Sequence, residues 1–373
     1  MTTVDRPVRV LWLIKGLGPG GAERLLVEHA RAGDHEQLQY EVAYLLDWKQ
    51  HLVPELEGLG VRTHCLGVAR EVDPRWVLRL QHLLRHEQFD VVHAHSPLLA
   101  TVARVVLQTL PRARRPAFAY TEHNRWPSYK VVTRVGNQLT YALNDATLAV
   151  SGDVRDSVTL RHRADVEVVV HGVDVAAVRL HIVERDRVRG ELGVQPGEAL
   201  AVTVANLRHG KNYPGLLAAA QLVVERGLPV RFAAAGQGPL AAEIDALHAA
   251  SGLGDRFALL GYREDATRLI AGADVFVLAS HHEGLPVTVM EALTLGVPVV
   301  APEVGGLREV VHSGENGILV EPGSPAALAD GIARAVAPEM HARLADGARA
   351  TGEQFASTHA VERIDALYRH LRG

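Results

Sequence analysis

Two glutamates, Glu283 and Glu291, stand out in the segment ASHHEGLPVTVMEALTLGVPVVAP. The run ADVFVLAS that leads into it is apolar and rich in β-branched residues, which predicts a buried strand. Pro286 favours the first turn of a following helix and Gly296 its end. Glu283 would then lie in the strand-to-helix loop, and Glu291 about a turn and a half into the helix. In an open parallel sheet, this edge is where ligands bind.

The start of this helix is suited to a phosphate. Backbone N–H groups near Gly284, Leu285, Val287 and Thr288 have no partner within the helix and would point between the two carboxylates. Hydroxyls at both ends with phosphate in the middle describe a nucleotide sugar. Glutamates near a helix start also serve as partners of the helix dipole or as solvated surface residues, and spacing alone leaves that interpretation open.

A basic loop, ANLRHGKNYPG, follows the first predicted strand of the second half of the chain. Arg208 and Lys211 flank Gly210 there and could neutralise a diphosphate. The segments AAAGQGP and LGYRED end two further strands; Gly236 would allow close approach to a nucleotide, and Arg263 could flank a base. Solvated turns are the alternative for each of these loops.

Several histidines are candidate site residues or candidate metal ligands. His123 follows the predicted strand AFAY and could hydrogen-bond a sugar or hold a proton, or be structural. The pairs His93 and His95, and His281 and His282, lack convincing four-ligand spacing for a metal. The chain contains no Asp-x-Asp pair, so a metal-held diphosphate lacks its usual carboxylates. We therefore expect no metal and no cofactor.

A glycine-rich segment, KGLGPGGAER, offers a rival function. Its loop at 16–21 satisfies the G-x-G-x-x-G spacing of a dinucleotide site, and Asp47 after the next predicted strand would be the ribose ligand. An NAD-dependent oxidoreductase is therefore an alternative, although a glycine-rich first turn serves many ligands.

The elements that must position these residues are α/β. Short apolar runs alternate with helical patterns along the 373 residues, which predicts two doubly wound, Rossmann-like parallel-sheet domains with a cleft between them. We expect domains at 1–175 and 176–355 and an amphipathic last helix at 356–373. The net charge of −4 gives no reason to expect nucleic acid. The single cysteine fits a reducing cytoplasm. No apolar run reaches the roughly 18–20 residues needed to span a bilayer.

A basic cluster, PRARR at 111–115 with nearby Arg104, could touch anionic membrane lipid. A solvated surface is the alternative. The expected location is the cytoplasm, with a peripheral contact at the inner face of the plasma membrane left open.

The combination of segments resembles the family 4 retaining glycosyltransferases of the GT-B fold, also known as glycosyl transferases group 1. The resemblance covers nearly the whole chain, and its most specific marker is the glutamate segment. The markers are GPGGAER, DVVHAHSP, TEHN, LAVSGDVRDSV, VVVHGVD, VANLRHGKN, AAAGQGP, ALLGYRED and HHEGLPVTVMEALTLGVPVVAPEVGGLREVV.

The resemblance implies that the second domain binds a UDP- or GDP-linked sugar and that the first domain binds a hydroxyl acceptor. Glu291 would hold the ribose and Glu283 the donor sugar. Lys211 with Arg208 would hold the diphosphate, aided by the helix start and by Gly20 and Gly21.

His123 would touch the donor sugar from the first domain, and the last helix would cross back to that domain. Two departures stand out. Ala205-Asn206 replaces the family's usual Gly-Arg, and His171 replaces a usual Asn. The implied reaction is hexosyl transfer with retention and without a metal. A nucleotide-sugar epimerase or a phosphorylase of the same fold is the alternative.

Overall fold

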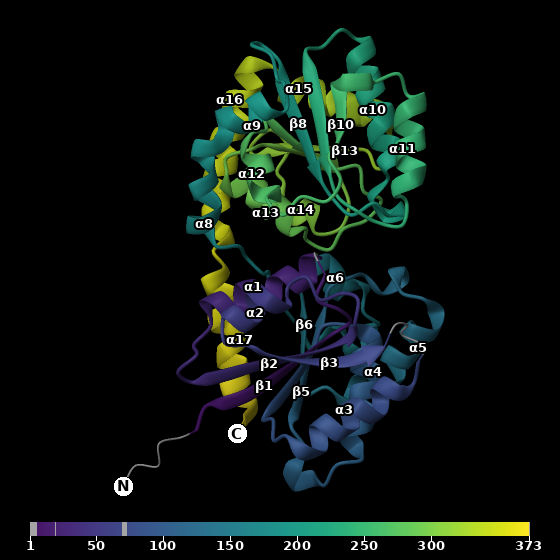
Figure 1. Cartoon of the computed structure of the whole chain (residues 1–373), viewed down its shortest axis with the longest axis vertical. Helices are drawn as coiled ribbons and strands as arrows, with labels where there is room; N and C mark the ends of the chain where they lie inside the picture. Colours follow the sequence, from purple (N-terminus) through teal and green to yellow (C-terminus); the bar gives the residue numbers. More distant parts are fainter. Residues whose placement is uncertain (1–5, 19, 69–72, 373) are drawn as a thin grey trace. The chain divides into compact units, whose positions relative to one another are not determined.

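The computed structural model describes residues 6–18, 20–68 and 73–372. The chain divides into two compact units (Figure 1). Unit 1 comprises Met1–Gly172 and Ser357–Gly373, and unit 2 comprises Val173–Ala356.

Unit 1 is built on a parallel sheet in which the described residues form seven strands, in the order β3-β2-β1-β4-β5-β6-β7. These strands are β1 (Val8–Ile14), β2 (Leu38–Leu46), β3 (Arg62–Val68), β4 (Val91–Ala94), β5 (Ala117–Glu122), β6 (Ala146–Ala149) and β7 (Val166–Val168). The helices are α1 (Gly21–Ala32), α2 (Val53–Gly58), α3 (Arg75–His86), α4 (Pro97–Gln108), α5 (Val131–Thr140), α6 (Gly152–Ser157), α7 (Leu160–Arg163) and α17 (Ser357–Arg372), with the short 3-10 helices η1 (Arg112–Arg114), η2 (Trp126–Ser128) and η3 (Tyr141–Leu143).

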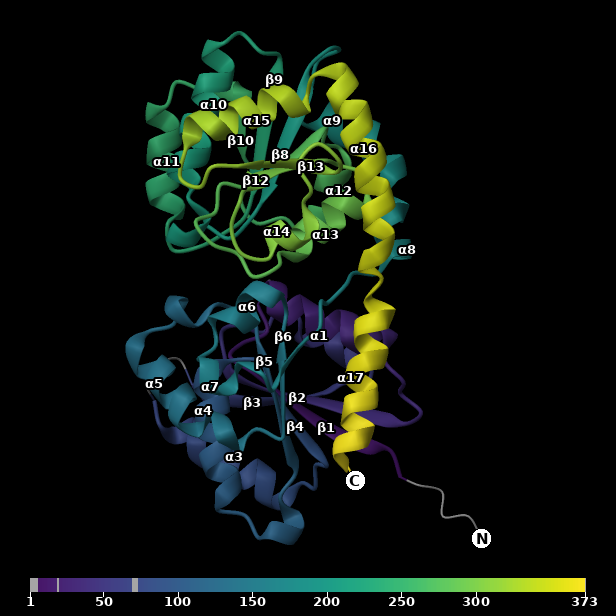
Figure 2. The same ribbon diagram turned by 180° about the vertical axis from the view of Figure 1, so that it is seen from behind.

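Both faces of this sheet are covered, which explains why its strands are continuous apolar runs without alternation. In β1, Leu11 and Leu13 enter the core under α3 and α4, whereas Val10 and Trp12 enter the core under α1 and α17. Figure 2 shows α17 lying across unit 1 beside β1. The two cores follow directly from the twofold side-chain period of a strand.

Buried polar contacts fix α17 on unit 1. Asp365 accepts a hydrogen bond from the Tyr40 hydroxyl at 2.8 Å and contacts His29 Nε2 at 2.8 Å. Trp12 Nε1 donates to the Tyr368 hydroxyl at 3.0 Å. Burial opposes ionisation of Asp365, but the hydrogen bonds from His29 and Tyr40 hold its pKa below the usual value. The last helix is therefore anchored by more than its apolar stripe.

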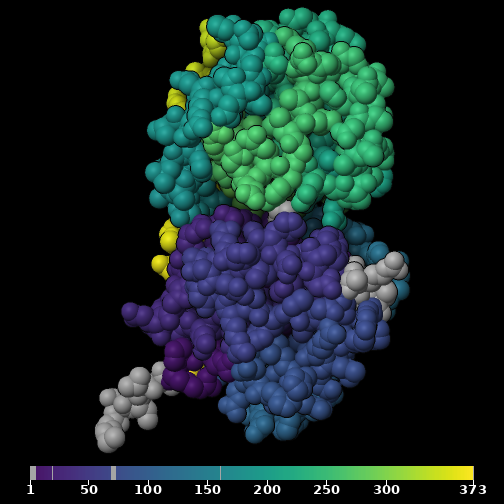
Figure 3. Space-filling view, in the orientation of Figure 1, coloured from purple at the N-terminus to yellow at the C-terminus, as the bar shows by residue number. Residues whose placement is uncertain are grey.

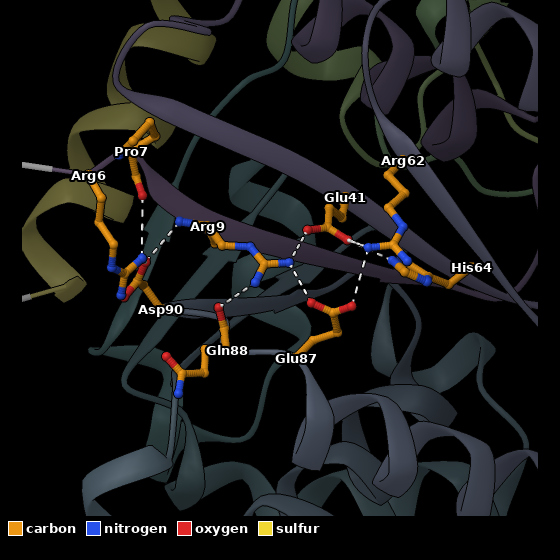
Figure 4. Close-up of polar contacts among 9 residues, drawn as sticks. All are labelled: Arg6, Pro7, Arg9, Glu41, Arg62, His64, Glu87, Gln88 and Asp90. Atoms are coloured by element: carbon orange, nitrogen blue, oxygen red, sulfur yellow. Dashed lines mark hydrogen bonds and ion pairs between the residues drawn. The ribbon is translucent and has the colours of Figure 1, made fainter.

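Charged side chains tie the amino ends of the strands together (Figure 4). Arg9 of β1 contacts the buried Glu41 of β2 at 2.5 Å and Glu87 at 2.9 Å, and His64 of β3 lies 2.7 Å from Glu41. Arg6 pairs with Asp90 at 2.7 Å. Burial opposes ionisation of Glu41, but hydrogen bonds from His64 and Arg9 lower its pKa. These ion pairs therefore stabilise this edge of the sheet.

Unit 2 repeats the pattern; its described residues form six parallel strands in the order β10-β9-β8-β11-β12-β13. The strands are β8 (Ala199–Val204), β9 (Val230–Ala235), β10 (Phe257–Leu259), β11 (Val275–Val277), β12 (Val299–Pro302) and β13 (Gly317–Val320). The helices are α8 (Val175–Arg179), α9 (Arg185–Glu191), α10 (Tyr213–Glu225), α11 (Ala241–Ala250), α12 (Ala266–Ala271), α13 (Val287–Thr294), α14 (Leu307–Val310), α15 (Pro325–Ala335) and α16 (Pro338–Gly352), with 3-10 helices η4 (Leu180–Glu184), η5 (His209–Lys211), η6 (Gly254–Arg256) and η7 (Glu353–Phe355).

The helix after the glutamate loop differs slightly from the sequence prediction. Pro286 precedes α13 as its N-cap residue with an extended backbone, so the helix begins one residue later, at Val287. Gly296 lies two residues beyond the end of α13 with φ of 74°, the left-handed conformation that glycine adopts without strain at a helix end.

A membrane-crossing helix would have to be both long and apolar. None of the helices in the described part of the chain meets both conditions.

Candidate functional site

The order of strands in unit 2 places two loops at a switch point of the sheet. From β8 the chain continues outward to β9 and β10, and from β11 it continues in the opposite direction to β12 and β13. The loops that leave the carboxyl ends of β8 and β11 therefore begin side by side, at the place where open parallel sheets bind their ligands. Lys211 belongs to the first loop and Glu283 to the second. The backbone N–H of His281 donates to the Gly210 carbonyl at 2.9 Å, which joins the two loops.

Lys211 and Glu283 bond to each other where these two loops meet. Lys211 Nζ lies 2.6 Å from Glu283 Oε1 and 2.7 Å from Oε2. The buried Ser280 donates its hydroxyl hydrogen to Glu283 Oε1 at 2.6 Å. Glu283 is buried, whereas the Lys211 side chain is 25% exposed. The carboxylate is therefore held in place, and the Lys211 side chain keeps partial contact with solvent.

Asn212 explains how Lys211 reaches this position. It is the one non-glycine residue among those described with positive φ, at 50°, a conformation that Asn tolerates better than most residues. Its side chain accepts a hydrogen bond from the Gly215 N–H at 3.2 Å and donates to the Ala279 carbonyl at 3.2 Å. These contacts end η5, start α10 and fix the basic loop against the loop of β11.

The remaining predicted residues of this region lie around the pair. Arg208 is exposed in the basic loop, and Gly284 and Leu285 lie half-buried in the glutamate loop. Val287 and Thr288 form the first turn of α13, whose N-terminal N–H groups have no partner within the helix. Their phosphate contact stays a prediction.

Glu291 is oriented by the neighbouring helix. It lies half-buried on α13, and its Oε1 accepts a hydrogen bond from the Thr267 hydroxyl of α12 at 2.9 Å. The two helices pack against each other. Glu291 is therefore part of a hydrogen-bonded pair and not a freely moving surface carboxylate.

The packing of two loops explains why a glycine is needed at position 236, which the sequence did not reveal. A Cβ at this position would lie 1.9 Å from the Ala205 carbonyl oxygen, because the loops after β8 and β9 approach closely. The Gly236 N–H also donates to the Gly261 carbonyl at 2.8 Å. Packing between loops thus requires this glycine, and its predicted contact with a nucleotide is not needed to explain it.

Arg263 is already paired within its own turn. Its Nε and Nη2 each donate to a carboxylate oxygen of Asp265 at 2.7 Å. Those hydrogen bonds lower the pKa of Asp265 to about 2. Because these N–H donors of Arg263 point to Asp265, the guanidinium group would offer a nucleobase its flat face.

The glycine loop of unit 1 lies between β1 and α1. Gly20 is the N-cap residue of α1 and Gly21 its first residue. The Leu17 N–H donates to the Lys49 carbonyl at 2.7 Å, which holds the loop against the one after β2. Pro19, within the predicted dinucleotide motif, lies outside the described residues, and Asp47 is exposed.

His123 belongs to a cluster of histidines at the carboxyl edge of the unit 1 sheet. Its Nε2 lies 3.1 Å from Nδ1 of His95, and its ring stacks on His171 with centroids 6.0 Å apart. Burial lowers the pKa of His123 to about 4 and that of His171 to about 3. His123 is therefore neutral at pH 7, which favours a hydrogen-bonding role over a stored proton.

Arg104 does not belong to the predicted lipid-binding cluster. Its side chain is fully buried, its Nε donates to Asn144 at 2.7 Å and its Nη1 to Asn137 at 2.7 Å. Burial lowers its pKa from the usual arginine value. The expectation was wrong because the asparagine partners of Arg104 are distant in sequence, so local sequence gave no sign that this charge is buried. Arg112 and Arg114 of the same cluster are exposed.

Sequence reasoning missed Ser280, Thr267 and Asn212. Ser280 ends the strand run three residues before Glu283, so its position was a usable signal. Thr267 gave none, because its contact with Glu291 depends on how α12 packs on α13.

Two family models match the chain: "Glycosyltransferase Family 4" over residues 19–177 and "Glycosyl transferases group 1" over residues 184–351. The putative glycosyltransferase EpsD of Bacillus subtilis is 28% identical over 306 residues, which cover 78% of this chain and 79% of EpsD. A D-inositol 3-phosphate glycosyltransferase of Xylanimonas cellulosilytica is 29% identical over 316 residues, which cover 78% of this chain and 74% of that protein.

A solved structure shares the fold. HepE of Anabaena, crystallised with UDP and glucose, superimposes with a TM-score of 0.81 at 20% identity, covering 96% of this chain and 98% of HepE. With the two parallel-sheet units, this likeness confirms the predicted GT-B fold. Neither the oxidoreductase nor the epimerase interpretation is favoured by these similarities.

Proposed function

This chain belongs to the group 1 and family 4 glycosyltransferases of the GT-B fold, and we propose that it transfers a hexosyl group from a nucleotide diphosphate sugar to a hydroxyl acceptor with the anomeric configuration retained. The observation that carries this proposal is the Lys211–Glu283 pair at the switch point of the unit 2 sheet. A cation and a carboxylate side by side match a donor with a phosphate beside a sugar.

The charges of the site would stabilise the charges that develop as the bond between sugar and diphosphate breaks. As the bond between the sugar's anomeric carbon and the diphosphate oxygen stretches, negative charge grows on the diphosphate and positive charge on the sugar. Lys211, Arg208 and the first-turn amides of α13 would stabilise the first, and Glu283 would stabilise the second. Because Ser280 also holds Glu283, the carboxylate keeps its place when Lys211 turns to the diphosphate.

The acceptor completes the reaction on the same face of the sugar. Its oxygen forms the new bond to the anomeric carbon, and its proton passes to the departing phosphate oxygen. No protein nucleophile is required. The cations of the site would do the work of a metal ion, since the sequence offers no Asp-x-Asp pair for one.

The rest of the donor would extend along unit 2. Glu291, oriented by Thr267, would accept hydrogen bonds from the ribose hydroxyls. Arg263 would lie against the base, and Gly236 would permit close approach near it. In unit 1, Gly20 and Gly21 would contact the diphosphate and His123 the donor sugar.

The donor in this proposal is a UDP-sugar or a GDP-sugar. HepE was crystallised with UDP and glucose, so UDP-sugars are the first donors to test. The decisive experiment is a screen of UDP- and GDP-sugars for slow hydrolysis, followed by mass spectrometry with hydroxyl acceptors. Lys211→Ala should lower turnover by about 10²–10³, and Arg187→Ala, at an exposed arginine of α9, should leave it unchanged. Turnover by Lys211→Ala at the wild-type rate would refute the proposal.

Three simple measurements separate this function from its alternatives. An epimerase would convert the donor with no acceptor present, and a phosphorylase would need inorganic phosphate. An oxidoreductase would bind NADH at the glycine loop, which a fluorescence titration against UDP would detect.

We place the enzyme in the cytoplasm, with peripheral contact to the inner face of the plasma membrane. The chain's single cysteine, Cys65, is free and exposed, which suits a reducing compartment. Cell fractionation that finds the native protein outside both the cytoplasm and the membrane fraction would contradict this placement.

A further inference from the structure

Charge is distributed unevenly along the chain. The whole chain has 39 basic and 43 acidic residues. Residues 97–144 nevertheless contain one acid, Glu122, and it is buried. The basic residues of the same segment are Arg104, Arg112, Arg114, Arg115, Arg125, Lys130 and Arg134. This stretch of unit 1 therefore carries mostly positive charge on a protein that is negative overall, although Arg104 is buried and Arg125 pairs with Asp153 at 3.2 Å.

The same segment contains a helix whose apolar side faces outward. On α5, Val131, Val132 and Leu139 are 64%, 85% and 79% exposed. Val131, Val135 and Leu139 are four residues apart, and Val132 lies three residues before Val135, so the four share one helical stripe. The buried residue of α5 is the polar Asn137, which donates to Glu122 at 3.1 Å and accepts from Arg104 at 2.7 Å. A polar network thus holds α5 in place, and its aliphatic stripe remains exposed.

Cations lie at the start of α5 and at the edge of the sheet toward which α5 ends. Lys130 immediately precedes α5 and Arg134 lies on it. Arg112 and Arg114 lie on η1, just before β5, and the partly exposed Leu143 ends η3, just before β6. Because β5 and β6 are adjacent and parallel, η1 and η3 lie at the same edge of the sheet. Figure 3 shows the part of the chain near residue 100, in blue, covering the lower surface of unit 1.

We propose that this basic, apolar surface of α5, η1 and η3 docks unit 1 onto an anionic membrane. The aliphatic stripe would enter the headgroup boundary, and the arginines and Lys130 would meet the lipid phosphates. A neutral bilayer would offer no partner for the cations. The acidic remainder of the chain would be repelled by the same lipids, which fixes which side of unit 1 turns to the membrane.

The test is flotation of the full chain with vesicles of phosphatidylglycerol and phosphatidylcholine, or of phosphatidylcholine alone. We expect binding to the anionic vesicles only, weakening as salt rises. The double variant Val132→Gln with Leu139→Gln should bind at least about tenfold more weakly. Arg112→Gln and Arg114→Gln should each cost about fivefold, the equivalent of about 1 kcal/mol per charge.

A matched control comes from unit 2. Leu180 and Val183 on η4 are 73% and 85% exposed, so Leu180→Gln with Val183→Gln removes a similar apolar area and should leave flotation unchanged. Equal binding to both vesicle types, no binding to either, or an equal loss in the control would overturn the proposal. So would a dimer in sedimentation velocity that the α5 variant dissociates, since a second copy would then cover the stripe.

A second inference concerns the histidines and rests on the proposed role of His123. Nε2 of the buried His95 has no hydrogen-bond partner within the described residues. A bare buried acceptor is tolerated better than an orphaned buried N–H. We infer that His95 carries its proton on Nδ1 and donates it to His123 Nε2, which leaves the proton of the neutral His123 on Nδ1. His95 is thus a positioning residue that makes His123 a donor toward a sugar oxygen.

Histidine-labelled nitrogen NMR reads this tautomer without any substrate, so its failure is distinct from failure of the transferase proposal. The His123 signals are assigned by their loss in His123→Gln. We expect Nδ1–H in the wild type and in His95→Asn, whose amide can donate from a similar position. His95→Leu should shift His123 toward Nε2–H. A wild-type His123 protonated on Nε2, or a His95→Leu variant with an unchanged tautomer, would overturn the inference.

Discussion

Removal of the Ser280 hydroxyl tests how the site holds its carboxylate. Ser280 is fully buried and donates to Glu283 Oε1 at 2.6 Å. Ser280→Ala takes away this charge-assisted bond, so that within the described part of the chain Lys211 is the side chain that still bonds to Glu283. When Lys211 moves to the diphosphate, Glu283 would then lose its fixed position.

The expected loss of activity follows from the charge on Glu283, which accepts this hydrogen bond. A hydrogen bond to a charged group contributes about 1.5–3 kcal/mol, so kcat/KM for the donor should fall about 10- to 100-fold. The assay is steady-state turnover of the best donor found in the screen, with urea unfolding measured in parallel.

Thr203→Val is the matched control for this prediction. Thr203 is buried in β8 and donates to the Val277 carbonyl at 2.7 Å, so the change also removes one buried hydroxyl. It should lower the free energy of unfolding by about 1 kcal/mol and leave kcat/KM within a factor of about two. Wild-type turnover by Ser280→Ala, or an equal loss in Thr203→Val, would refute the reasoning.

The remaining predictions concern stability and are checked by urea unfolding. Glu41→Gln breaks a buried ionic network and should cost about 3–5 kcal/mol. Because the native pKa of Glu41 is lowered, its contribution is full above the unfolded pKa and is lost as the pH falls through the native value. The deficit of Glu41→Gln relative to the wild type should therefore shrink in acid, and a constant deficit would contradict the assignment. Gly236→Ala places a Cβ 1.9 Å from the Ala205 oxygen and should cost about 1–3 kcal/mol or more. Gly210→Ala, with its nearest contact at 3.5 Å, should cost far less, and equal losses would refute the packing argument.

The sequence predicted the scaffold of the site well because parallel sheets obey strict rules. Alternating apolar runs and helical patterns indicated two parallel-sheet units, and Glu283 was correctly placed in a strand-to-helix loop. The basic loop and the glutamate loop do leave neighbouring strands, β8 and β11.

Contacts between distant residues could not be read in the same way. Lys211 and Glu283 are 72 positions apart, and nothing local indicates that they bond to each other. Arg104 looked like a surface charge because its asparagine partners lie 33 and 40 positions away. Gly236 looked like a ligand contact, although the neighbouring loop alone requires it.

The most direct test of the central claim is how strongly the site prefers a diphosphate. Calorimetry gives this preference as the dissociation constant of uridine divided by that of UDP. If the donor is GDP-linked, guanosine and GDP are compared instead. Lys211→Met should lower this ratio about tenfold or more and leave the affinity for the nucleoside unchanged. An unchanged ratio, or an equal loss of affinity for nucleoside and diphosphate, would contradict the claim that Lys211 holds the diphosphate beside Glu283.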